Sequence, residues 1–163
     1  SLRVARIVHG AISAGVVVFL AVIWLIRRGG APPQPEAEQT LLLVGVVLAL
    51  SSVVASFVVP GLAARAATQR LASRDDASLD QAQIAGAFLT QGIVGWALVE
   101  GPALFFGVVA LISGSRTAVG AMLGLLALLV ARAPGREGFD RFVRETGREV
   151  SRLRSSRMSA GRS

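Results

Sequence analysis

Four long apolar runs constrain this chain more than any other feature. They cover Val4–Ile26, Leu41–Ala64, Ile84–Ile112 and Ala118–Ala131. The first three reach the roughly 20 residues that a helix needs to cross the hydrocarbon core of a bilayer. A soluble domain would instead carry helices that are apolar on one face only. The sequence therefore predicts an all-α, polytopic membrane protein.

We expect one transmembrane domain over residues 1–133, built as a four-helix bundle. Its spans are predicted at about residues 4–28, 41–64, 80–112 and 116–132. The first span is longer than the roughly 7–15 apolar residues of a signal peptide, so it is interpreted as uncleaved. The fourth is the shortest, and a re-entrant or interfacial segment remains an alternative for it. Between the last two, Ser113-Gly114-Ser115 predicts a tight turn.

The arginines indicate how the bundle is oriented. Positive residues prefer the cytoplasmic side of a membrane. With four spans, only Arg27, Arg28 and Arg116 of the 17 arginines lie on the opposite side. Both termini are therefore expected in the cytoplasm. The chain has no Lys, Asn or Tyr, as codon usage in a GC-rich genome would favour, so we expect the inner membrane of a bacterium.

Small residues at helical spacing are the expected packing surfaces. Helices in lipid associate through close contact of small side chains rather than through hydrophobic burial. Such stripes occur on the second, third and fourth runs. The candidate packing residues are Gly45, Ala49, Ser52, Ser56, Gly86, Ala97, Gly107, Gly120, Gly124 and Ala127.

Glu100 is the single carboxylate within the four runs. A charged side chain at the bilayer centre costs on the order of 2.5–3.5 kcal/mol on insertion scales, so Glu100 is a functional candidate. Pro102 removes the helical hydrogen bond to the Leu98 carbonyl and leaves an acceptor within a turn of the carboxyl group. His9, on the first run, is a candidate partner or an interfacial hydrogen-bonding residue. Glu100 could join helices by hydrogen bonding, or it could carry an ion.

The sequence around Glu100 resembles a known family. Ala97-Leu98-x-Glu100-Gly101-x-Ala103-Leu104-Phe105, followed by Val108-Val109-Ala110-Leu111, is similar to the ion-carrying helix of rotary ATP synthase proteolipids, the subunit c family. In that family the glutamate takes up and releases a proton or sodium ion at the surface of a ring. The resemblance is confined to this segment, and it implies the same ion-carrying role for Glu100.

The chain after the fourth run is expected to form an amphipathic helix over residues 134–155 and a disordered basic tail over 156–163. Apolar residues recur on one helical face from Phe139 to Leu153. The other face carries arginines that we expect to contact anionic lipid headgroups, or a partner protein. These membrane-surface candidates are Arg141, Arg144, Arg148 and Arg152.

Composition narrows the function classes. The chain has no Cys and one His, which excludes a disulfide and a multi-histidine metal site. We find no phosphate-binding loop and no nucleophile–base set, and we expect no enzyme, cofactor or nucleic-acid partner. The leading hypothesis is a structural or accessory subunit that forms a homo- or hetero-oligomer in the lipid bilayer. The alternative is a proton- or sodium-translocating subunit that uses Glu100.

Overall fold

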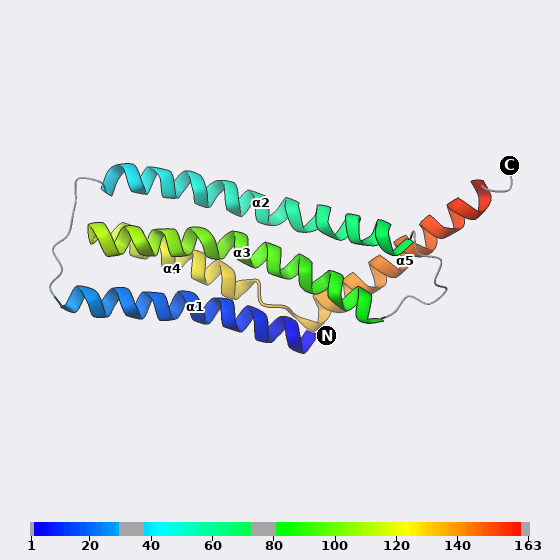
Figure 1. Cartoon of the computed structure of the whole chain (residues 1–163), viewed down its shortest axis with the longest axis horizontal. Coiled ribbons are helices and arrows are strands. Elements are labelled where there is room, and N and C mark those ends of the chain that lie inside the picture. The colour runs from blue at the N-terminus through cyan, green and yellow to red at the C-terminus, as the bar shows by residue number, and fades with distance from the viewer. Residues whose placement is uncertain (1, 30–37, 73–80, 161–163) are drawn as a thin grey trace.

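The computed structural model of the chain describes residues 2–29, 38–72 and 81–160, and the regular structure within them is entirely helical. The prediction of an all-α fold is confirmed for these residues. Figure 1 shows the arrangement of the helices. They are α1 (Leu2–Arg28), α2 (Glu38–Ala72), α3 (Gln81–Ser113), α4 (Arg116–Ala131) and α5 (Arg136–Ala160).

Two helices run further than the sequence predicts. Helix α2 continues to Ala72, past the end of its apolar run at Ala64, because the alanines and arginines that follow favour helix. Helix α5 continues to Ala160, through most of the segment expected to be disordered. Residues 161–163 of that expected tail lie outside the described residues.

Helix α3 is the centre of the bundle. It packs against α1, α2 and α4, and Figure 1 shows it between α1 and α2 with α4 behind. Val99 and Val109 of α3 are fully buried together with Val16 of α1 and Met122 of α4. Helix α3 is apolar around most of its circumference, which suits a helix that contacts neighbours on several sides.

Helices α1 and α3 run parallel and in register. The ring of His9 meets that of Trp96 at a centroid distance of 4.9 Å. Further along, Gly15 lies beside Glu100, and Phe19 covers Gly107. We call the end of the bundle where α1 begins the proximal end, and the end near Arg28 the distal end. Because Gly15 is central in the apolar run Val4–Ile26, Glu100 lies near the middle of the apolar band.

The turn between α3 and α4 lies at the distal end, at the residues where the sequence predicts it. Gly114 has a φ of 74°, in the left-handed region that glycine tolerates best. The Ser115 hydroxyl accepts a hydrogen bond from the backbone N–H of Ala118 at 3.2 Å and so caps α4. This compact turn sends α4 back toward the proximal end.

The proximal end joins α1 to the α4–α5 connection. The Arg6 Nε donates a hydrogen bond to the Pro134 carbonyl at 3.3 Å. Helix α5 bends away from α4 by 61° and extends beyond the bundle, as Figure 1 shows. Its apolar face packs on α2 and α3, with the Phe139 and Phe142 rings 5.1 and 5.5 Å from that of Phe88.

Three helices, α1, α2 and α3, are long and apolar enough to cross a bilayer, and α4 with α5 would be a fourth span if the bent pair crosses as one unit. At 1.5 Å per residue, α1 is about 40 Å long, whereas the hydrocarbon core is about 30 Å thick. Exposed leucine, valine and phenylalanine side chains cover the outside of α1 and α2. These features are those of a membrane protein.

Candidate functional site

Glu100 lines a groove between α1 and α3. This Glu100 groove has a volume of about 550 Å³, and its other walls include Phe19, Leu104 and Phe105. The carboxyl group is half-buried, and a Cβ added to Gly15 would lie 3.7 Å from its Oε1. The carboxyl group therefore lies beside the backbone of α1 at Gly15, at a distance where an added Cβ would make an ordinary van der Waals contact.

The two residues predicted to act with Glu100 are placed differently. His9 lies more than a helical turn closer to the proximal end, against Trp96, and no hydrogen bond joins it to Glu100. Pro102 is buried within α3, which continues through it to Ser113. Across the described residues Glu100 has no hydrogen-bonding or ion-pair partner. A donor for it would therefore have to come from outside these residues.

The small-residue stripe of α2 is an internal contact. Gly45 is buried, and a Cβ added there would lie 2.8 Å from the Phe106 ring of α3. Ser56 is also buried, and Ala49 and Ser52 between them are half-buried. On α3 itself, the predicted stripe is divided. Gly107 is covered by Phe19, whereas Gly86 and Ala97 are exposed.

The stripe of α4 faces away from the bundle. Gly120 and Gly124 are exposed, and a Cβ added to either would have no atom within 4 Å. Ala127 is exposed on the same face. The buried residues of α4 lie on the opposite side of the helix and are Ala118, Met122, Leu125 and Leu129. This smooth face of α4, formed by Gly120, Gly124 and Ala127, therefore has no neighbour among the described residues.

The predicted membrane-surface arginines, Arg141, Arg144, Arg148 and Arg152, are all exposed on α5. On the other side of this helix, Thr146 and Val150 are buried. The four arginines are therefore exposed, while the apolar face of α5 packs on α2 and α3 of the same chain.

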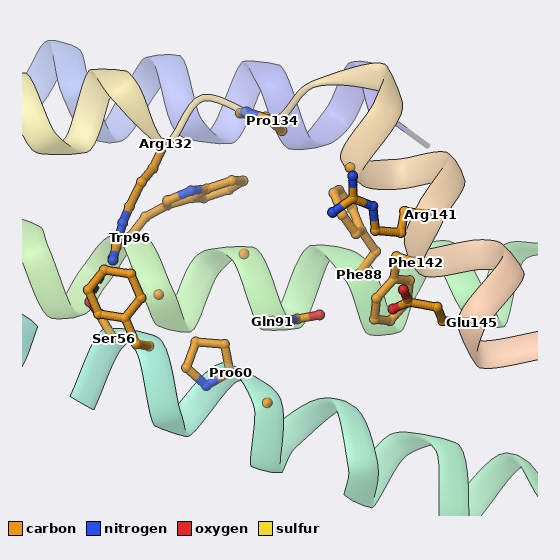
Figure 2. A pocket seen from close by; sticks show the side chains of 15 residues that line it. Ser56, Pro60, Phe88, Gln91, Trp96, Arg132, Pro134, Arg141, Phe142 and Glu145 are labelled. Atoms are coloured by element: carbon orange, nitrogen blue, oxygen red, sulfur yellow. Dashed lines mark hydrogen bonds between the residues drawn. The ribbon is translucent and has the colours of Figure 1, made fainter. Parts of the chain in front are cut away.

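A second groove, which the sequence analysis did not identify, lies near the proximal end. It has a volume of about 490 Å³ and is bounded by α2, α3 and the start of α5. In Figure 2, Arg132 reaches across it from the end of α4 toward Ser56 of α2, and Gln91 projects into it from α3. We call it the Arg132 groove. Two features of the sequence could have indicated this groove. Gln91 is a polar residue inside an apolar run, and Arg132 directly follows the shortest of the four runs.

Contacts within the chain hold the Arg132 guanidinium on one side only. Its Nη1 donates to the Ser56 hydroxyl at 2.6 Å, and its guanidinium lies over the Phe57 ring, 4.0 Å from the centroid. The Ser56 hydroxyl in turn donates to the Val53 carbonyl. The Nη2 of Arg132 and the Oε1 of Gln91 are buried and have no hydrogen-bond partner.

Comparison of the chain with family models, with curated proteins and with solved structures found no match. Any assignment of function therefore depends on the geometry of the two grooves and of the exposed helix faces. Among the described residues no group of three or more His, Cys, Asp or Glu side chains could hold a metal ion.

Proposed function

We propose that this chain is a non-enzymatic, four-span subunit of a membrane assembly, and that it associates with neighbouring subunits through the exposed small-residue face of α4. The proposal includes a bacterial inner membrane, with the proximal end in the cytoplasm. The observation that carries it is the smooth face at Gly120 and Gly124, which is open in the single chain.

The placement of α4 supports four crossings. Helix α4 begins after Gly114, where an added Cβ would overlap the Arg27 guanidinium at the distal end of α1. It ends just before Pro134, which accepts a hydrogen bond from Arg6 at the proximal end. Its own length is about 24 Å, so a thinned bilayer or the first residues of α5 would complete the crossing. The concentration of arginines at the proximal end supports a cytoplasmic position for that end.

The physical chemistry of lipid explains why an open glycine face is informative. A helix that only faces lipid gains nothing from glycine, which costs roughly 1 kcal/mol relative to alanine in a helix. Glycines do allow two helix backbones to approach closely, and interhelical contacts in membranes are enriched in them. On α2 the same kind of stripe is already used against α3. The stripe on α4 is therefore an open surface of the kind on which another chain packs.

The test is cross-linking of single-cysteine variants in native membranes, which is direct because the natural chain has no cysteine. A Gly120→Cys variant should form a cross-linked species with a second copy or with a partner subunit. Adding Gly124→Leu should abolish that species, because the larger side chain separates the helices. Gly101→Leu is the matched control, since Gly101 of α3 is also exposed with no atom near an added Cβ. Equal cross-linking in all three backgrounds would contradict the proposal.

Ion translocation through Glu100 is the second candidate, and one observation favours it. The carboxyl group lies in an open groove on the side of the bundle, near the middle of the apolar band. No partner among the described residues neutralises or holds it. A proton or sodium carrier needs a carboxylate that can exchange its ion, as the resemblance to subunit c implies. Loss of proton or sodium flux in a Glu100→Gln variant would favour this role over the first.

A further inference from the structure

We propose that the Arg132 groove binds the headgroup of an anionic phospholipid, with Arg132 as the principal ligand of the phosphodiester. This inference does not depend on how the chain associates through α4. It follows from the hydrogen bonding of Arg132, from the depth of the groove and from the character of its walls.

The hydrogen bonding of Arg132 is incomplete. A guanidinium has five N–H donors, and leaving a buried donor unsatisfied costs about 1–3 kcal/mol, with more for a charged group. Ser56 and the Phe57 ring account for one side of Arg132, whereas Nη2 is buried without an acceptor. No carboxylate in the described residues pairs with it. Because Nη2 is covered in this structure, the Arg132 side chain would have to turn outward to meet an anion, which would then supply both the missing acceptor and the missing charge.

The partial charge at the end of a helix does not neutralise Arg132 as a bound anion would. Arg132 is the C-cap of α4, and the carbonyl end of a helix carries roughly half a negative charge. This partial charge favours an arginine at the position but neutralises only part of it. At the start of α5, Arg141 and Glu145 also line the groove, and their charges are opposite. The groove therefore keeps an excess of positive charge, which Arg132 supplies.

The depth of the groove matches the headgroup region. Pro134, two residues after Arg132, is hydrogen-bonded to Arg6, which lies near the start of the apolar run of α1. Trp96, which lines the groove, contacts His9 about one turn further in. The groove thus extends from the edge of the apolar band a short way into it. A lipid phosphate would occupy the outer part of the groove near Pro134, while the contact of Arg132 with Ser56 lies deeper, level with Gly95 of α3.

The walls favour a lipid over a free phosphate. Apart from Arg132 and Gln91, much of the central lining is apolar and aromatic, including Phe57, Pro60 and Trp96. Phe57 continues onto the exposed apolar surface of α2, along which an acyl chain could lie. Gln91 supplies an unpartnered acceptor, which suits a hydroxyl on the headgroup. Phosphatidylglycerol, with one negative charge and free hydroxyls, combines these features.

The experiment measures lipid binding to the purified, delipidated chain in neutral detergent by native mass spectrometry and by thermal stability. Phosphatidylglycerol should bind and raise the melting temperature. Phosphatidylcholine has the same phosphodiester, but its choline cation cancels the net charge and offers no hydroxyl to Gln91, so it should bind about tenfold more weakly. Inorganic phosphate, which has no acyl chain, should not protect. Protection by inorganic phosphate alone would show a soluble anion in the groove and overturn the proposal.

Two variants locate the site. Arg132→Gln should weaken phosphatidylglycerol binding by about tenfold or more. Arg116→Gln removes the same charge from an exposed position at the distal end, away from the groove, and should bind as the natural chain does. Because Arg132→Gln could also perturb the end of α4, Arg141→Gln at the exposed mouth of the groove serves as a second variant, with a smaller loss of binding. Unchanged binding in both groove variants, or an equal loss in Arg116→Gln, would overturn the proposal.

Discussion

At the scale of single residues, the distal turn depends on one glycine. Gly114 has a positive φ, and an added Cβ would overlap the Arg27 guanidinium, which packs over the turn. We predict that Gly114→Ala lowers the free energy of unfolding by about 1–2 kcal/mol, the cost of a left-handed conformation for an L-residue. Reversible unfolding in mixed micelles measures this change in the free energy of unfolding.

The control for that substitution has the opposite expectation. Gly147 lies in α5, and a Cβ added there would have open space around it. Because alanine favours helix over glycine by about 1 kcal/mol, Gly147→Ala should leave stability unchanged or raise it slightly. If Gly114→Ala is as stable as Gly147→Ala, the turn does not need its glycine.

Glu100 gives the second prediction at this scale. Since it has no partner within the described chain, Glu100→Gln should leave folding, association and function unchanged, because the amide keeps a donor and an acceptor at the same length. Glu100→Leu should leave the single chain stable. If Glu100 bonds to a neighbouring subunit, this variant should weaken association by about 0.6–2 kcal/mol. Flux in proteoliposomes and the monomer–oligomer equilibrium report the two properties, and lost flux in Glu100→Gln would favour the ion-carrying role instead.

Single residues also show what the sequence could predict about the two grooves and what it could not. Hydrophobicity identifies Glu100 as unusual, and the repeat of the helix places it near a small-residue stripe. The partner of Arg132 could not be predicted, because an arginine at the end of a span can extend to the headgroups or turn inward. The choice depends on Ser56 and Phe57, which are 76 and 75 positions away in the chain and come close only through packing against α3.

At the scale of helices, the stripes of α2 and α4 look alike in sequence and differ in use. Both place glycine, alanine or serine at intervals of three or four residues. Gly45 of the α2 stripe is buried against the Phe105 and Phe106 rings, whereas Gly120 and Gly124 of the α4 stripe are open. Periodicity reports which face is smooth, but it does not report which neighbour that face meets. Because the two stripes meet different surroundings, the same substitution should have different effects on α2 and on α4.

We therefore predict opposite phenotypes for one substitution on the two helices. Gly45→Leu should destabilise the single chain by about 1–3 kcal/mol through overpacking, because even a Cβ would lie 2.8 Å from Phe106. Gly124→Leu should leave the unfolding free energy of the dissociated chain unchanged and reduce association. Unfolding and cross-linking measured on the same two variants distinguish these effects. Equal loss of stability in both would show that the α4 face is packed within the chain.

At the scale of the whole molecule, the arrangement of the helices links orientation to the number of crossings. The distal turn at Gly114 and the hydrogen bond from Arg6 to Pro134 place the two ends of α4 at the two ends of α1. If α1 crosses the bilayer, α4 does so as well, although it has only 16 residues. Length and hydropathy alone could not establish this, since the fourth run is shorter than the roughly 20 residues of a usual span.

Labelling of single cysteines with a membrane-impermeant maleimide tests this arrangement. In intact cells Gln34→Cys, between α1 and α2, should react, because four crossings with a cytoplasmic proximal end place this connection outside. Thr68→Cys near the end of α2 and Ser163→Cys should react only after the membrane is opened. Labelling of Gln34→Cys in opened membranes controls for reactivity. A Ser163→Cys variant that reacts in intact cells, while Thr68→Cys stays protected, would mean that α4 does not cross and that the chain has three spans. The bond between Arg6 and Pro134 argues against that result, because it holds the chain after α4 at the same end as the beginning of α1.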